Sequence, residues 1–157
     1  MSDQYDVVII GGGIIGLSTA MHLLQRHPRL RLAVLEKDGG LAGQQTGHNS
    51  GVIHSGIYYR PDSLKAQFCV DGRAAMVEFC EANDIAYERC GKVIVATREE
   101  ELPRLDALLE RGLANGVEGL EMVEPDRLRE IEPHVVAIRA LWAPSTAIVD
   151  FTAVAEV

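Results

Sequence analysis

Apolar and polar positions along the first 36 residues predict a strand, a helix and a second strand. Residues 5–10 form a short apolar run rich in β-branched side chains, which is typical of a buried parallel strand. Residues 14–26 place leucine and methionine side chains on one helical face, and residues 32–36 form another apolar run. Together the three elements have the size of a βαβ unit.

Helices and antiparallel strands are predicted for the rest of the chain. Two segments carry apolar side chains near the helical period and predict helices over residues 62–83 and 99–115. A short helix is predicted over residues 125–131. Shorter apolar segments predict strands at residues 122–123 and 138–142. Residues 85–97 predict a hairpin that turns at Gly91.

A long polar segment, residues 37–59, separates the βαβ unit from the next predicted helix. It is rich in Gly, Ser, Thr, Asn and His and has no clear periodicity. Irregular connections of this length tend to be functional. We therefore expect side chains that carry chemistry within this segment.

Composition and charge narrow the class of protein. With 47% hydrophobic and 24% charged residues, the 157-residue chain is typical of a globular protein. The formal net charge of −8 argues against nucleic-acid binding. The three cysteines lack CxxC spacing, so no metal site is expected and a reducing compartment, the cytoplasm, is predicted. The first apolar run is too short for a signal peptide or a membrane span, although peripheral contact with an inner membrane stays open.

A Gly-x-Gly-x-x-Gly motif lies between the first strand and the first helix. Gly11 is expected to allow a tight turn, Gly13 a close backbone approach to a pyrophosphate, and Gly16 close packing of the helix on the strand. Amide groups at the start of the helix, including those of Ile14 and Ile15, would face the phosphates, whose charge the helix dipole favours. In this position the motif predicts a dinucleotide site.

An acidic residue, Glu36, closes the second strand. It stands where a carboxylate accepts hydrogen bonds from the adenosine ribose in dinucleotide-binding folds. The same carboxylate would repel a 2′-phosphate, which disfavours NADP. Lys37 follows it and belongs to the predicted cofactor site. These residues alone do not separate NAD from FAD.

The polar segment favours FAD over NAD. A flavin extends beyond the ADP half, so it needs small residues where it passes close to the chain and hydrogen-bond donors for its pyrophosphate and ring. The candidates in the segment are Thr46, His48, Asn49, Ser50, Gly51 and Val52. We predict that they contact the cofactor.

Three stretches of the sequence resemble a known family. The pattern of residues 11–36 is shared by many flavoproteins, and residues 45–59 are more specific. With residues 91–97, they closely resemble the L-2-hydroxyglutarate oxidase/dehydrogenase branch of the D-amino-acid-oxidase-like FAD-dependent oxidoreductases. The resemblance implies FAD as cofactor and oxidation of the dicarboxylate L-2-hydroxyglutarate to 2-oxoglutarate. Oxygen and a quinone are both open as electron acceptors.

The expected reaction needs a base that takes the hydroxyl proton while a hydride passes from Cα to flavin N5. A neutral imidazole suits that role near neutral pH. His54 is the first candidate and His48 the second, and a structural or phosphate-side role stays open for each. In related amine dehydrogenases a histidine near this point is covalently attached to the flavin, which is a further role for His48.

A dicarboxylate substrate is expected to face cations. Arg60 and Lys65 follow the polar segment and are candidates, with solvated positions at a helix start as the alternative. Tyr58 and Tyr59 are expected either to hydrogen-bond a carboxylate or to pack under the segment.

We predict an α/β fold with two domains. Residues 1–84 would form a Rossmann-like FAD-binding domain, and residues 85–157 the start of an antiparallel-sheet α+β substrate domain. Asp150 is expected to cap a helix that begins at Phe151, so the chain would stop inside a helix as the N-terminal fragment of a longer protein. The alternatives are an amine (sarcosine/glycine-type) or glycerol-3-phosphate oxidising flavoenzyme, and a non-catalytic dinucleotide-binding module.

Overall fold

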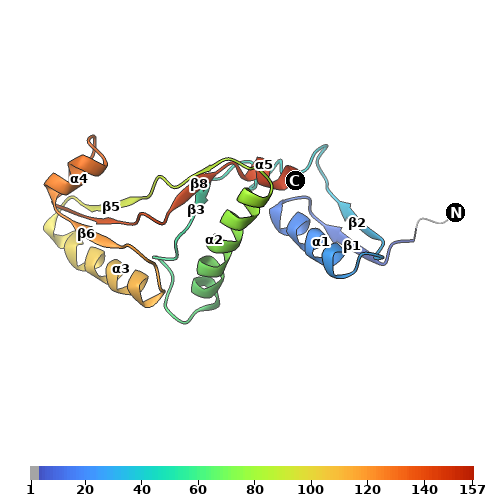
Figure 1. Ribbon diagram of the computed structural model, residues 1–157, viewed down its shortest axis with the longest axis horizontal. Helices are drawn as coiled ribbons and strands as arrows, with labels where there is room; N and C mark the ends of the chain where they lie inside the picture. Colours follow the sequence, from blue (N-terminus) through green and yellow to red (C-terminus); the bar gives the residue numbers. More distant parts are fainter. Residues whose placement is uncertain (1–3) are drawn as a thin grey trace. The chain divides into compact units, whose positions relative to one another are not determined.

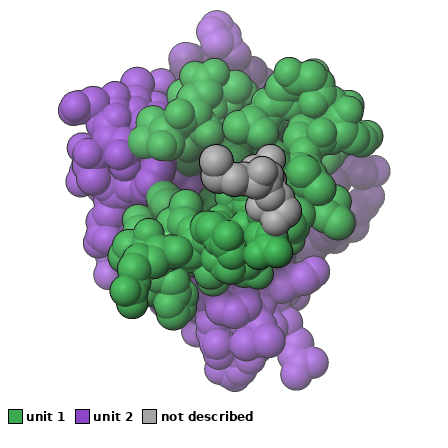
Figure 2. All heavy atoms as spheres, turned by 90° about the vertical axis from the view of Figure 1, so that its right-hand side faces the viewer, with its two compact units in different colours: residues 1–51, 150–157 green, residues 52–149 purple. Residues whose placement is uncertain are grey.

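The computed structural model describes residues 4–157, which divide into two compact units (Figure 2). Unit 1 contains the residues up to Gly51 together with residues 150–157. Unit 2 is the continuous stretch Val52–Val149. The chain therefore leaves unit 1 once and returns to it once.

Unit 1 contains the predicted βαβ unit. Strand β1 (Val7–Ile10) pairs in parallel with β2 (Leu32–Leu35), and α1 (Ile14–Arg26) connects them (Figure 1). α1 packs on both strands and on α5 (Phe151–Glu156). The predicted cap of α5 is confirmed, because Asp150 Oδ1 accepts a hydrogen bond of 2.8 Å from the Thr152 amide.

The first sheet of unit 2 has the strand order β3-β8-β4, and both of its pairings are antiparallel. Its strands are β3 (Val52–Ile53), β8 (Ala147–Val149) and β4 (Tyr87–Glu88). The long helix α2 (Leu64–Ala82) lies between β3 and β4 in the sequence. Ser63 caps α2, since its hydroxyl accepts a hydrogen bond from the Ala66 amide at 3.2 Å.

The second sheet of unit 2 has the strand order β5-β7-β6, again antiparallel. Its strands are β5 (Val93–Ala96), β7 (Arg139–Trp142) and β6 (Glu121–Val123). Helix α3 (Leu102–Ala114), which follows a 3₁₀ turn at Glu99–Glu101, packs on β5 and β7 (Figure 1). α4 (Pro125–Ile131) packs on β7.

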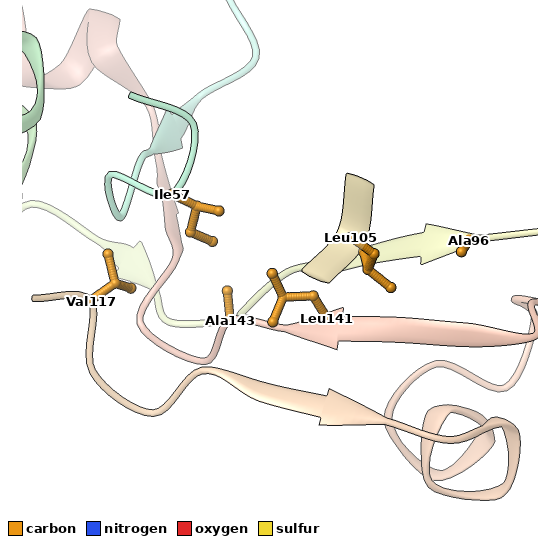
Figure 3. Packing of buried hydrophobic residues seen from close by; sticks show 6 residues of the cluster. All are labelled: Ile57, Ala96, Leu105, Val117, Leu141 and Ala143. Atoms are coloured by element: carbon orange, nitrogen blue, oxygen red, sulfur yellow. The ribbon is translucent and has the colours of Figure 1, made fainter. Parts of the chain in front are cut away.

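The main core of unit 2 lies between α3 and this second sheet (Figure 3). Leu105 of α3 and Leu141 of β7 are buried there together with Ile57, which comes from the polar segment. The same cluster contains Ala96, Val117 and Ala143. Burial of Ile57 anchors the end of the polar segment to the core, because a fully buried apolar side chain favours the folded position by about 1.5–3 kcal/mol.

The predicted hairpin at residues 85–97 is wrong. β4 pairs with β8, whereas β5 pairs with β7, so the two strands belong to different sheets. Gly91 does turn the chain, with φ +71°, but its amide donates to the Thr146 carbonyl at 3.0 Å. The turn therefore holds β5 to the connection between β7 and β8 and not to β4.

The two observed units meet in the sequence after Gly51 and after Val149, whereas the predicted domain boundary lies between residues 84 and 85. That boundary falls within unit 2, because β3 pairs with β8 and both belong to this unit. The division of a longer protein into an FAD-binding domain and a substrate domain stays a prediction. Among residues 4–157, no helix is both long and apolar enough to cross a membrane.

Candidate functional site

The glycine turn after β1 has the geometry that the motif predicts. Gly11 adopts φ +109°, a backbone conformation that disfavours other residues. A Cβ atom on Gly16 would overlap the carbonyl oxygen of Gly11 and would lie 3.4 Å from Cγ2 of Ile9. The absence of side chains at these two positions therefore permits the sharp turn and the close packing of α1 on β1.

The N-terminus of α1 presents unpaired amide groups. The amides of Gly13, Ile15 and Gly16 donate to no group within residues 4–157. The Ile14 amide differs, because it donates to Oγ1 of Thr46 at 3.0 Å. Three donors at the positive end of a helix dipole form an arrangement that binds phosphate oxygens.

The Glu36 carboxylate is held next to this turn. Its Oε2 accepts from the Gly12 amide at 2.6 Å, and its Oε1 accepts from the Asp38 amide at 3.0 Å. These bonds to Gly12 first, and then to Asp38, lower the pKa of Glu36 below its ordinary value. The group is therefore an anionic acceptor beside the glycine turn. Lys37 beside it is exposed.

The polar segment folds over the glycine turn with Thr46 buried beneath it. Asn49 braces the segment, since its Nδ2 donates to the Thr46 carbonyl at 2.6 Å and its Oδ1 accepts from the Gly51 amide at 2.6 Å. Ser50 is exposed. Thr46 and Asn49 thus have structural contacts of their own, and their predicted contact with the cofactor stays a prediction.

His48 is exposed, and its Nδ1 lies 3.0 Å from the Gln44 carbonyl oxygen. A carbonyl oxygen only accepts, so Nδ1 carries the proton of this hydrogen bond. In the neutral ring the lone pair is then on Nε2, which is the nitrogen available for a base or for attachment to a flavin.

His54 follows β3 directly in the sequence and lies at the surface of unit 2. Its backbone is fixed, because its carbonyl accepts from Sγ of Cys69 at 3.4 Å and Ser55 next to it is buried. Partial removal from solvent lowers the pKa of the imidazole, and the positive charge of Lys92 lowers it further. His54 is therefore neutral at neutral pH, as a general base must be.

Tyr58 and Lys92 lie together on the surface of unit 2. The Lys92 Nζ lies 4.4 Å from the centroid of the Tyr58 ring, a cation–π contact. Lys92 also influences His54, so unit 2 combines an imidazole, a phenol ring and an ammonium group. Lys92 was not among the predicted site residues, because the pairing of β5 with β7, which no local pattern reveals, sets its position.

The other predicted substrate residues have different surroundings. Tyr59 is half-buried, and its carbonyl accepts from Nδ2 of Asn115 at 2.9 Å. Arg60 and Lys65 are exposed, and within the described residues neither forms a hydrogen bond or ion pair with His54. The structure therefore places the Lys92 ammonium over the Tyr58 ring, and the charge of Lys92 acts on His54.

Comparison with known proteins shows the family of the chain. The family model described as FAD dependent oxidoreductase matches residues 6–156, so the chain belongs to the FAD-dependent oxidoreductase family. The mitochondrial L-2-hydroxyglutarate dehydrogenase of Homo sapiens is 52% identical over 154 residues, which are 98% of this chain and 33% of the human protein. The L-2-hydroxyglutarate dehydrogenase of Indibacter alkaliphilus is 50% identical over 98% of this chain and 38% of that protein. The chain thus spans about a third of the length of these relatives.

Solved structures show the same fold. The FAD-bound L-α-glycerophosphate oxidase of Mycoplasma pneumoniae superimposes with a TM-score of 0.87 at 30% identity, over 97% of this chain and 40% of that one. Glycine oxidase of Bacillus cereus superimposes with a TM-score of 0.76 at 28% identity, over 98% of this chain and 42% of that one. The predicted fold class and the predicted family are confirmed.

Proposed function

We propose that this chain is the N-terminal part of an FAD-dependent enzyme that oxidises L-2-hydroxyglutarate to 2-oxoglutarate. The single observation that carries the proposal is the 52% identity to a dehydrogenase of that name over 98% of the chain. The site residues are consistent with it, since the chain has free amides at a helix N-terminus, a carboxylate next to them and a histidine whose pKa is lowered.

The residues of unit 1 fit the ADP half of FAD. The free amides of Gly13, Ile15 and Gly16 would bind the pyrophosphate, and the Glu36 carboxylate would accept from the ribose hydroxyls. When bound, FAD supplies the acceptor for a hydride from the substrate Cα. Within unit 1, Thr46 fixes the polar segment against the start of α1 and thereby preserves the shape of the site.

His54 is our candidate for the general base. Its imidazole takes the hydroxyl proton on a ring nitrogen as the Cα–H bond is broken, so that a carbonyl group forms. The lowered pKa keeps that nitrogen unprotonated before the reaction. His48 is the second candidate because its Nε2 carries the lone pair in the neutral ring.

The substrate proposal is tested with the full-length protein under anaerobic conditions. Bleaching of the flavin absorbance by L-2-hydroxyglutarate is expected, with sarcosine and glycerol-3-phosphate as comparison substrates. The structural relatives that oxidise glycerophosphate or glycine supply this second candidate function. Bleaching by one of those two compounds but not by the hydroxy acid would contradict our substrate and favour the alternative.

The electron acceptor and the location are also proposals. We infer that electrons pass to oxygen or to a quinone, which stopped-flow reoxidation of the reduced flavin by each acceptor distinguishes. The three cysteines are free thiols, as is usual in a reducing compartment. We therefore propose a cytoplasmic location with peripheral contact at the inner membrane, and cell fractionation after a high-salt wash tests it.

Covalent attachment of flavin through His48 is a separate question. Release of all flavin into the supernatant after acid precipitation would exclude a bond to the protein. Retention of the yellow colour in the pellet, lost in a His48→Ala variant, would establish it.

A further inference from the structure

The backbone of Lys92, the residue before β5, is held by hydrogen bonds. Its amide donates to the Ala143 carbonyl at 3.1 Å, and its carbonyl accepts from the Ala143 amide at 2.8 Å. The preceding residue, Gly91, packs under the Trp142 ring, because a Cβ atom there would overlap the indole. The backbone from which the Lys92 side chain extends is therefore fixed by Ala143 and by the packing of Gly91 against Trp142.

Within residues 4–157, the ammonium group of Lys92 has an aromatic neighbour and no ion-pair partner. It lies over the Tyr58 ring, the residue is half-buried, and it forms no ion pair within residues 4–157. A charge that is partly removed from water costs free energy unless a counter-charge compensates it. Arg31 and Arg139, by contrast, have carboxylate partners at 3.0 Å and 3.2 Å. The surroundings of Lys92 thus suit an anion that a ligand supplies.

The segment that carries His54 and Tyr58 is rigidly attached to α3. Arg111 donates to the Tyr58 carbonyl at 3.1 Å, and Asn115 donates to the Gly56 carbonyl at 2.8 Å. Ile57 between them is 1% exposed. The imidazole, the ring and the ammonium group are therefore presented from a backbone that needs little rearrangement to bind a ligand.

We propose that Lys92 binds a carboxylate of the hydroxy-acid substrate beside the Tyr58 ring and next to His54. The assignment rests on the proposed function above. A hydroxy acid offers a hydroxyl group to the imidazole and a carboxylate to the ammonium group, and charge-assisted hydrogen bonds of this kind are among the stronger ones in proteins. Lys92, in place of Arg60 or Lys65, is then the specificity-determining cation of this chain.

The test compares Lys92→Met, Lys92→Arg and Arg89→Met in the full-length protein. Arg89 is a matched control, because its guanidinium also lies over a tyrosine ring, 5.8 Å from the centroid of Tyr87. Lys92→Met is expected to raise KM for L-2-hydroxyglutarate and Kd for glutarate, an unreactive dicarboxylate, by about tenfold to a hundredfold. Lys92→Arg is expected to restore most of the lost affinity, and Arg89→Met is expected to leave KM and Kd unchanged.

A monocarboxylate of the same chain length, L-2-hydroxyvalerate, identifies the carboxylate that Lys92 binds. If Lys92→Met raises KM only for the dicarboxylate, Lys92 binds the carboxylate far from the hydroxyl carbon. If it raises KM equally for both compounds, Lys92 binds the carboxylate next to the hydroxyl carbon. Unchanged KM and unchanged Kd for glutarate in Lys92→Met, at normal flavin content and Tm, would overturn the proposal. Absence of L-2-hydroxyglutarate oxidation by the wild type would instead overturn the proposed function. The role of Lys92 in carboxylate binding is then tested separately by comparing glutarate binding to the wild type and to Lys92→Met by calorimetry.

Discussion

The Glu36 carboxylate performs two tasks with one pair of oxygens. It holds the Gly12 and Asp38 amides and, in our proposal, accepts from the ribose hydroxyls as well. Both tasks require an anion, because every partner is a donor. The lowered pKa ensures that this anion persists at pH values well below neutrality.

Glu36→Gln is therefore expected to weaken FAD binding by about tenfold, since one of its two carboxylate oxygens is replaced by a group that cannot accept. Titration of the apoprotein with FAD measures the change. Glu78→Gln, an exposed position on α2, provides the matched control and is expected to leave the affinity unchanged. An FAD affinity in Glu36→Gln equal to that of the wild type would show that the carboxylate only stabilises the turn and does not bind FAD.

The pKa of His54 predicts a pH dependence of catalysis. Burial and Lys92 lower this pKa below 6.5, so the neutral imidazole persists as the pH falls through 6.5 and is lost only at lower pH. The acid limb of kcat/KM is accordingly expected below pH 6.5. Lys92→Met removes a positive charge, so the limb is expected to move to higher pH, whereas Arg89→Met leaves it in place. An acid limb that stays the same in both variants would argue against His54 as the base.

At the scale of elements, two glycines in helices have opposite surroundings. A Cβ atom on Gly16 in α1 would overlap the backbone of Gly11, which cannot move away cheaply, whereas one on Gly72 in α2 would meet nothing within 4 Å. A glycine inside a helix often marks a close backbone approach, and the structure shows none at Gly72.

Gly16→Ala is therefore expected to destabilise the protein by about 1–3 kcal/mol and to reduce flavin content. Gly72→Ala is expected to stabilise it by about 0.5–1 kcal/mol, because alanine favours the helix. Urea unfolding followed by circular dichroism measures both. Similar free energies of unfolding for the two variants would contradict the close packing of α1 on β1.

Elements with a clear periodicity or a strong end signal were predictable. The βαβ unit, α2 and α3 follow from apolar spacing, and Asp150 marked the start of α5. β3 and β8 were missed because β3 lies in a polar segment without periodicity, and its pairing with β8 joins residues far apart in the sequence. The hairpin was wrong because adjacent strands in sequence need not pair, and the partner of β5 lies more than forty residues away.

The same reasoning applies to the candidate site. Gly11, Gly16 and Glu36 were predictable because local geometry demands their residue types next to a phosphate or ribose. Lys92 was not, since only long-range strand pairing brings it near Tyr58. No local pattern separates it from solvated lysines.

At the scale of the whole molecule, unit 1 has few large buried side chains. Among its described residues, 4–51 and 150–157, the buried apolar ones are Ala20, Ala42 and Val154, whereas Ile10 is 87% and Ile15 is 79% exposed. Parallel sheets are normally covered on both faces. We attribute this exposed surface to the further residues that the longer relatives possess.

The 157-residue chain is therefore expected to retain less FAD and to have a lower Tm than the full-length protein. It is also expected to bind more of a hydrophobic dye, because Ile10, Ile15 and Leu35 are accessible. Gel filtration followed by flavin absorbance, with calorimetry for Tm, compares the two polypeptides. Full activity and full flavin content in the short chain would contradict the proposal that it is part of a larger enzyme.

The return of the chain to unit 1 at Asp150 has a consequence for synthesis. α1 packs on α5, and Gly47 lies close to Thr152, so unit 1 needs its last eight residues before these contacts can form. Unit 2, a continuous stretch, can fold as soon as it leaves the ribosome. At roughly 5–20 residues per second, about a hundred intervening residues take on the order of 5–20 s to translate. During that interval the nascent glycine turn lacks its closing helix, and chaperones have time to bind it.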